Sequence, residues 1–363
     1  MNDLRPAARV PLLVLGMLSL LGGVLGGLAR LDWSVPSVAV TSAGWHGALM
    51  ISTFLGTVIS LERAVAIGRG WAYLAPAAAG IGGVALIAGA PLIVTQALTV
   101  VAATILVAAS VQVMRRQLAP FTLILAIGAL CWLTGNLAWL AGGDLTAAVP
   151  WWMAFLVLTI AGERLELTRF LPTPAAAQRV FFVIVGGLLA GATTSFWRAD
   201  AGLALFAASL LALAAWLLRY DIARRNARQQ GLVRFIALCL LSGYAWLVLA
   251  GLLGVAGGFL PGHPWRDATL HAVGLGFVFS MIFGHAPIIF PAVVQVKIPW
   301  HPFYYLPLLV LHTSLALRVL GGLSGEFPLR REGGLLNAIA LLLFIATLLA
   351  SVVRGRSEAQ QPG

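Results

Sequence analysis

Four histidines of this chain stand inside apolar stretches, where an ionisable side chain is costly and often functional. His46 occurs in "GWHGALM" and His271 in "DATLHAVGLGF", each near the start of an apolar run. A neutral imidazole is the commonest protein ligand of metals, and two imidazoles can hold a haem iron axially or bind copper. Both runs are predicted to enter the membrane from the same face, so the two rings are expected at similar depth. We interpret His46 and His271 as ligands of haem b or copper; the alternative is two interfacial histidines bonded to water or headgroups.

The other two intramembrane histidines are further candidate metal ligands. His285, in "SMIFGHAPII", follows His271 by 14 residues, which is about four helical turns or 21 Å. That separation excludes one metal shared by these two residues, but a second site or a polar relay stays open. His312, in "LLVLHTSLAL", is expected near the middle of its helix, where it would face a cofactor or bond to a neighbouring helix.

Two Glu-Arg pairs also stand in apolar runs. Glu62 and Arg63 lie in "FLGTVISLERAVAIG", and Glu163 and Arg164 lie in "FLVLTIAGERLEL". Both pairs are predicted near the cytoplasmic ends of their helices, from which long charged side chains reach the interface. We interpret them as mutually neutralising anchors, or alternatively as a polar cluster that takes up protons at the inner face.

These residues belong to a chain with the composition of an integral membrane protein. Of its 363 residues, 60% are hydrophobic and only 10% are charged, which is far more apolar than a soluble domain. The pattern predicts an all-α polytopic membrane protein with twelve transmembrane helices, each near the roughly 20 residues that cross a bilayer core. The predicted spans are 10–28, 44–66, 71–89, 91–113, 119–141, 149–168, 179–197, 200–218, 234–257, 268–290, 302–321 and 334–354. The two cysteines lie in separate apolar runs and form no haem-attachment motif.

The distribution of basic residues orients the predicted helices. With the N-terminus in the cytoplasm, 17 of the 23 Lys and Arg residues fall on the inner side and the remaining six on the outer side, as the positive-inside rule requires. The sequence therefore predicts a bacterial inner-membrane protein with both termini in the cytoplasm. The net charge of +11 comes from basic residues in these connections. We interpret them as topology signals and as contacts to anionic lipid headgroups, not as a nucleic-acid-binding surface. The predicted partners are the lipid bilayer and an electron donor or partner membrane subunit.

The chain shows signs of an internal repeat. In the two Glu-Arg stretches a Phe precedes the glutamate by eight residues, and in "FVFSMIFGHAPII" the same step ends on His285. These stretches fall on the predicted helices 2, 6 and 10, which run in the same direction. We interpret this as a four-helix unit repeated over 1–113, 119–218 and 234–354 within a single transmembrane domain, 1–363. Chance matches in a sequence rich in Leu, Gly and Ala are the alternative.

Twelve helices in this plan, with histidines on helices 2 and 10, resemble the haem–copper oxidase subunit I superfamily. In that superfamily, histidines on those two helices hold the low-spin haem near the outer face, and His46 and His271 match these positions. The motif "WHGALM" is also similar to the "WHAHEM" of the NnrS family, haem- and copper-containing membrane proteins linked to nitric oxide stress. Trp45, His46 and Met50 carry this match.

The departures from both families bear on the chemistry. Ala48 and Leu49 stand where the NnrS motif has its second His and its Glu. The predicted helices 6 and 7 contain none of the histidines that build the oxidase binuclear centre, and helix 10 lacks an H-x-H pair. The resemblance therefore implies haem ligation without a binuclear centre that reduces oxygen or nitric oxide.

Together these observations predict a haem-binding membrane protein, with copper as the alternative metal. Its role would lie in redox chemistry, sensing or protection against nitrogen oxides, and whether it is an enzyme stays open. One alternative is a proton-coupled secondary transporter that uses the charged inner cluster. The threefold repeat argues against it, because transporters usually show twofold repeats. The other alternative is a non-catalytic membrane subunit or assembly factor.

The predicted orientation can be tested with reporter fusions. Fusions at Gly363 and in the arginine-rich connection 219–234 should both report a cytoplasmic location, because each follows an even number of predicted spans. A periplasmic signal from either fusion would contradict the topology and the depth assigned to every histidine.

Overall fold

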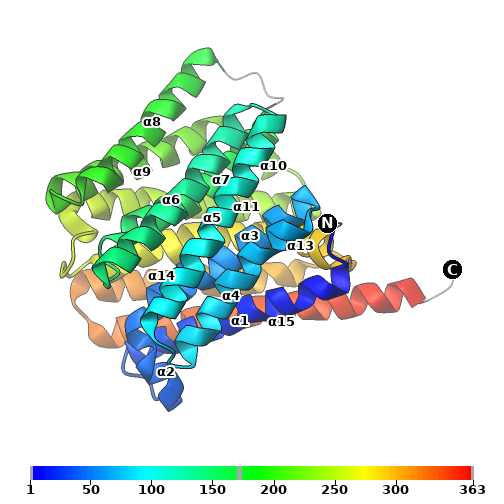
Figure 1. The fold of residues 1–363 in the computed structure, drawn as a ribbon, viewed down its shortest axis with the longest axis horizontal. Helices are drawn as coiled ribbons and strands as arrows, with labels where there is room; N and C mark the ends of the chain where they lie inside the picture. Colours follow the sequence, from blue (N-terminus) through cyan, green and yellow to red (C-terminus); the bar gives the residue numbers. More distant parts are fainter. Residues whose placement is uncertain (1–2, 170–173, 361–363) are drawn as a thin grey trace. The chain divides into compact units, whose positions relative to one another are not determined.

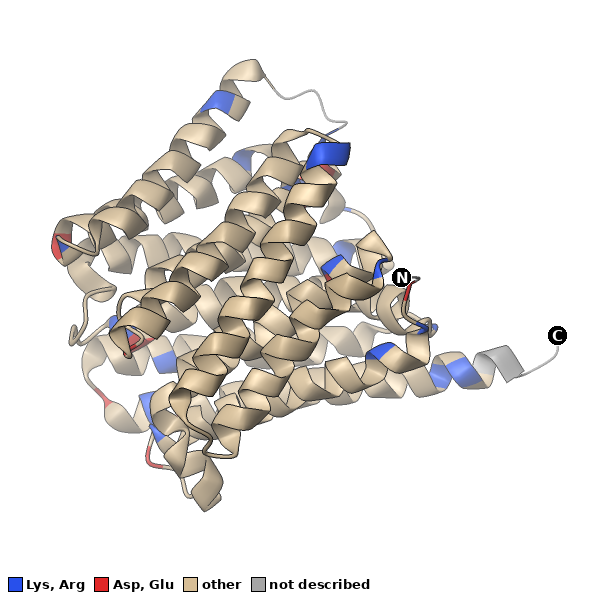
Figure 2. Cartoon of the chain, in the orientation of Figure 1, with Lys and Arg blue, Asp and Glu red and all other residues tan. Residues whose placement is uncertain are grey.

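Every secondary-structure element in the described part of the chain is a helix. The computed structural model describes residues 3–169 and 174–360. Within them, twelve helices are long and apolar enough to cross a membrane. Figure 1 shows these helices, and Figure 2 shows that Lys and Arg gather at helix ends and in the connections. The predicted all-α polytopic fold is confirmed.

The helices agree closely with the predicted spans. Three short helices, α2 (Ser37–Thr41), η1 (Ala43–Trp45) and α10 (Ala223–Asn226), lie in connections. The twelve spans are α1 (Pro6–Ala29), η2 with α3 (Ala48–Leu55, Gly56–Ile67), η3 with α4 (Gly70–Tyr73, Leu74–Ile87), α5 (Leu92–Arg116), α6 (Pro120–Gly142), α7 (Ala148–Thr168), α8 (Ala175–Thr194), α9 (Ala199–Tyr220), α11 with η4 (Gly231–Leu253, Gly254–Gly258), α12 with η5 and α13 (Arg266–His271, Ala272–Phe279, Ser280–Val294), η6 with α14 (Pro302–Tyr304, Tyr305–Ser324) and α15 (Phe327–Gln360).

The largest difference is the start of the last helix. The predicted span begins at residue 334, but α15 begins at Phe327 and includes the charged residues 330–332. The left-handed Gly325 (φ 76°) ends α14 and turns the chain directly into α15. Gly333 then packs against the backbone of Arg318 on α14, where an added methyl group would stand 2.7 Å from its Cα. Close packing of this hairpin therefore extends the helix past the charged residues.

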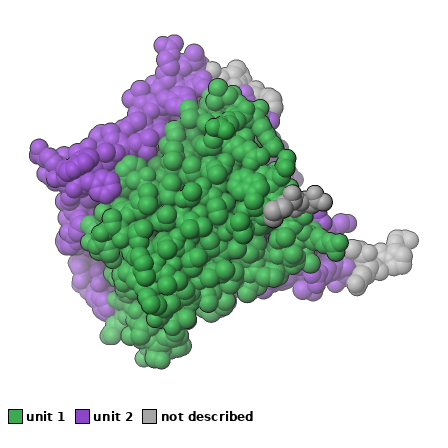
Figure 3. Space-filling model, viewed as in Figure 1, with its two compact units in different colours: residues 1–166 green, residues 167–363 purple. Residues whose placement is uncertain are grey.

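The chain divides into two compact units, Met1–Glu166 and Leu167–Gly363 (Figure 3). The first unit holds α1 to α7 apart from the last two residues of α7, and the second holds α8 to α15. Each unit is described by itself below. The threefold repeat read from the sequence stays a prediction.

The core of the first unit is organised around Asn136 on α6. Its buried Oδ1 accepts hydrogen bonds from Ser52 Oγ at 2.7 Å and from Trp152 Nε1 at 2.9 Å. Its Nδ2 donates to the carbonyl of Thr99 at 2.9 Å, and Trp132 Nε1 donates to Ser52 Oγ at 3.1 Å. Hydrocarbon offers no competing partners for these groups. The network therefore ties η2, α5, α6 and α7 to one another.

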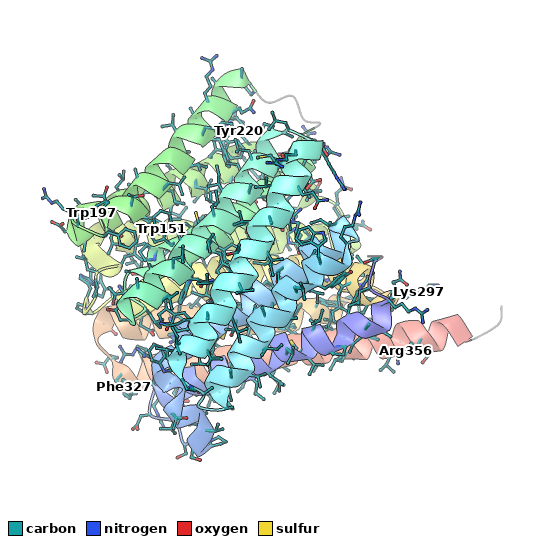
Figure 4. The ribbon with its side chains drawn as sticks, in the orientation of Figure 1. Trp151, Trp197, Tyr220, Lys297, Phe327 and Arg356 are labelled. Carbon is teal, nitrogen blue, oxygen red and sulfur yellow. The ribbon has the colours of Figure 1, made fainter. Side chains whose placement is uncertain are left out.

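Two further features show how the second unit is suited to a bilayer. Glycines let α8 and α9 approach closely: a methyl group at Gly191 would stand 2.5–2.9 Å from α9 backbone atoms. Trp197 precedes α9 and Tyr220 ends it, so the two aromatic rings bracket this helix (Figure 4). A helix of 22 residues is about 33 Å long, which matches a bilayer core with aromatic residues at both interfaces.

Helices 2 and 10 of the predicted order share an unusual backbone. Each contains a π-helix of eight residues, η2 (Ala48–Leu55) and η5 (Ala272–Phe279), and each π-helix begins one or two residues after a histidine. π-helical segments are rare and frequently occur at functional sites. The helix predicted to be equivalent, α7, is α-helical throughout.

The close contact of Gly191 on α8 with the α9 backbone leads to a prediction about stability. Gly191→Ala should lower the free energy of unfolding by about 1–3 kcal/mol because the methyl group overpacks this contact. Gly186→Ala on the same helix is the matched control, since a methyl group there meets no described atom within 4 Å. Denaturant unfolding in detergent measures both, and equal stability of the two variants would contradict the packing.

Candidate histidine site

His46 lies between η1 and η2, against the glycine-rich face of α1. Its ring is half-buried, and its Nδ1 is 2.5 Å from the carbonyl oxygen of Gly23. A methyl group at Gly27 would stand only 2.8 Å from the imidazole Cε1. Met50, one turn further on, places its sulfur against Gly23. Gly23 and Gly27 therefore leave the space in which His46 and Met50 pack against α1.

His271 is the last residue of α12 and stands one helical turn after Asp267. Its Nδ1 lies 2.8 Å from the Asp267 carbonyl oxygen and 3.4 Å from the carboxylate Oδ1. The same carboxylate accepts two hydrogen bonds from Arg318 of α14, from Nε at 2.9 Å and from the terminal nitrogen at 2.8 Å. His271 is thus held by its own helix turn and by an ion pair between two helices.

The position of Nδ1 decides which ring nitrogen can bind a metal. In His46, His271 and His285, Nδ1 meets a main-chain carbonyl, that of Met281 at 2.8 Å in the case of His285. A carbonyl oxygen only accepts, so Nδ1 carries a proton, and in the neutral ring Nε2 carries the lone pair. Metal-binding histidines are commonly fixed in this way, with the second nitrogen donating to a carbonyl or carboxylate.

His312 has the opposite arrangement. Its Nδ1 accepts a hydrogen bond from Trp246 Nε1 at 2.9 Å, and the two rings are nearly parallel. The proton therefore lies on Nε2, which is buried and has no partner within the described residues. In this state His312 is a donor, and metal binding through Nε2 would require the loss of that proton.

Small residues leave room beside the two candidate haem ligands. A methyl group at Gly274, three residues after His271, would meet no described atom within 4 Å. At Gly47 the nearest such atom is Leu145 Cδ1, at 3.7 Å. Gly276, which also lies close in sequence, instead seats the Trp246 ring. Each of these two glycines therefore leaves open space next to its own histidine, and each histidine offers a nitrogen donor, which fits a metal-bearing group at either residue.

The four predicted inner residues come together in the first unit. Glu62 and Arg63 lie on α3, and Glu163 and Arg164 lie on α7. The charged groups within electrostatic reach of Glu163 are Glu62, Arg63, Arg164 and Glu166. Arg164 is buried, with 4% of its surface exposed, whereas both glutamates are half-buried. Acidic and basic groups thus share one cluster, at the ends of two helices.

The four candidate histidines are divided between the two compact units. His46 belongs to the first unit, whereas His271, His285 and His312 belong to the second. Among the residues that the structure describes, no group of three or more His, Cys, Asp or Glu side chains could hold a metal ion. A bis-histidine iron site needs only two protein ligands, so the shared iron of His46 and His271 stays a prediction.

Sequence reasoning missed the partners of two histidines. Arg318, one of the six basic residues assigned to the outer side, lies in α14 and pairs with Asp267. The spacing of Asp267 and His271 by four residues was the available signal, because such residues are neighbours on a helix. Trp246 offered no comparable signal, since its contact with His312 joins separate helices.

Residues 9–353 match the family described as Domain of unknown function (DUF8744). The match runs from within α1 to within α15 and so covers nearly the whole chain. No curated protein matches the sequence.

The group formed by Glu62, Arg63, Glu163 and Arg164, here called the mixed-charge cluster, leads to a prediction about stability. Glu163→Gln should lower the free energy of unfolding by about 1–3 kcal/mol, because buried Arg164 and its neighbour Arg63 lose a compensating charge. Glu326→Gln, at an exposed position, is the control and should change nothing. Denaturant unfolding in detergent measures both. An unchanged stability of Glu163→Gln would contradict the anchoring role.

Proposed function

The chain belongs to the DUF8744 family, and we propose that it is a membrane protein that binds b-type haem through His46 and His271, with copper as the alternative metal. One shared feature carries this proposal. Each histidine stands one or two residues before an eight-residue π-helix and has its Nδ1 held by a main-chain carbonyl. Within the described residues, only these two π-helices are preceded by a histidine in this way.

The chain's own residues would orient the ligands and set their protonation. The carbonyls of Gly23 and Asp267 hold the protons on Nδ1 of His46 and His271, so that Nε2 of each ring can donate its lone pair. A haem bound by two imidazoles supplies one-electron chemistry. This supports the redox, sensing or nitrogen-oxide role that the resemblance to NnrS proteins implies.

The mixed-charge cluster supports a second candidate, a proton-coupled transporter. Glutamates grouped inside apolar helices are typical of proton relays, and Glu62 and Glu163 lie within electrostatic reach of each other. In a transporter the Glu62→Gln, Glu163→Gln double variant would abolish proton uptake into proteoliposomes while the protein stays folded. Unchanged uptake would eliminate this candidate.

Haem binding can be tested by spectroscopy. The purified protein should show a low-spin bis-imidazole haem spectrum and a positive pyridine haemochrome assay. His46→Ala and His271→Ala should each lose that spectrum, because a bis-imidazole iron needs both ligands. His263→Ala and His301→Ala are matched controls, since each of these Nδ1 atoms accepts a hydrogen bond from a backbone amide of its own turn, and both should retain the haem.

The same experiment decides against the proposal if the wild-type protein carries neither haem nor copper after expression with haem precursors and copper in the medium. The transporter, or a non-catalytic subunit or assembly factor, would then be the better explanation of the fold.

A further inference from the structure

His46 and His271, the two proposed ligands, differ in the groups that lie close to their Nδ1 atoms. His46 Nδ1 meets the carbonyl oxygen of Gly23. His271 Nδ1 meets a carbonyl oxygen and, at 3.4 Å, the carboxylate of Asp267. The hydrogen bond of His271 Nδ1 goes to the carbonyl oxygen, and the carboxylate adds a negative charge beside the ring. That charge makes Nε2 a better donor to a metal.

Arg318 limits this effect. Its side chain is buried, with 9% exposed, and it forms two hydrogen bonds to Asp267, one to each carboxylate oxygen. The oxygen nearest His271, Oδ1, is therefore shared between the imidazole and the guanidinium. Arg330 adds a second positive charge within electrostatic reach of Asp267. The carboxylate that faces His271 is thus held in one orientation and partly neutralised.

We propose that Asp267 is a positioning residue that orients His271 and lowers the reduction potential of the metal it binds, and that Arg318 sets how strongly it does so. This inference rests on the proposed function, because it requires a metal on His271 Nε2. Neither residue touches that metal. Asp267 acts through the imidazole, and Arg318 acts through Asp267.

The two single variants should shift the potential in opposite directions. Asp267→Asn removes the negative charge beside the ring and leaves the backbone carbonyl in place, so the ratio of reduced to oxidised haem at a fixed applied potential should rise several-fold. Arg318→Gln releases the carboxylate towards His271, so that ratio should fall several-fold. For a one-electron couple a tenfold change in the ratio is about 59 mV, which redox titration of the haem spectrum resolves.

A double variant separates the effect of the carboxylate beside the ring from the effect of the local net charge. Asp267→Asn with Arg318→Met removes one charge of each sign, so the local net charge is unchanged and no buried ion is left alone. It also covers the case in which a single variant fails to fold. The reduced-to-oxidised ratio should still rise, because the negative charge that is removed lies 3.4 Å from His271 Nδ1, whereas Arg318 acts through Asp267. Asp200→Asn, at an exposed site in the first turn of α9, is the control and should leave the ratio unchanged.

The outcomes distinguish this inference from the function on which it rests. If wild-type protein binds haem and His271→Ala loses it, but the double variant titrates like wild type, Asp267 has only a structural role and the inference fails alone. If wild-type protein carries no haem or copper, the proposed function fails and the inference fails with it. Opposite shifts in the single variants and a rise in the double variant would support it.

Discussion

The bilayer interior supplies no hydrogen-bond partners, and this constraint governs the whole fold. Every polar group placed between the helix ends must find a partner within the protein. The constraint explains why the described chain is helical, and why its intramembrane hydroxyls bond to carbonyls of their own helix turns, as Thr53, Thr57 and Ser60 do. It also explains the dense contacts of Asn136, whose amide would otherwise be left unsatisfied in an apolar core.

Polar groups inside the helices that find their partners on other side chains, and not on their own helix turn, point to a specific role. Asp267 and Arg318 place two opposite charges in one hydrogen-bonded pair, and His271 joins them. Such a pair gains little net stability, because both charges must leave water. Its geometry, with two bonds in a fixed plane, gives orientation instead. His312 shows the converse case, since its buried Nε2 has no partner in the described residues and so stays at an energetic cost.

Much of the fold could be predicted from the sequence, because hydropathy over a span of this length has only one structural solution in lipid. The spans were correct to within a few residues, except at α15, where the Gly325 turn outweighed the charges that follow it. The candidate histidines could be identified by residue type and by their place in apolar runs. Their tautomers and the Asp267–Arg318 pair could not, because these depend on contacts between helices. The π-helices were also invisible, since a shifted hydrogen-bond register leaves no trace in hydropathy.

The π-helix η2 also sets the relative orientation of two residues on either side of it, His46 and Glu62. A helix that closes its hydrogen bonds at i→i+5 advances by a smaller angle per residue than an α-helix does. The eight residues of η2 therefore fix the angular phase between His46, which precedes them, and Glu62, which follows on α3. A one-residue deletion inside η2 that restored ordinary winding would rotate one of these side chains around the helix axis relative to the other. The direction of the His46 side chain relative to Glu62 therefore depends on the length of the π-helix η2 as well as on the residues that contact the ring.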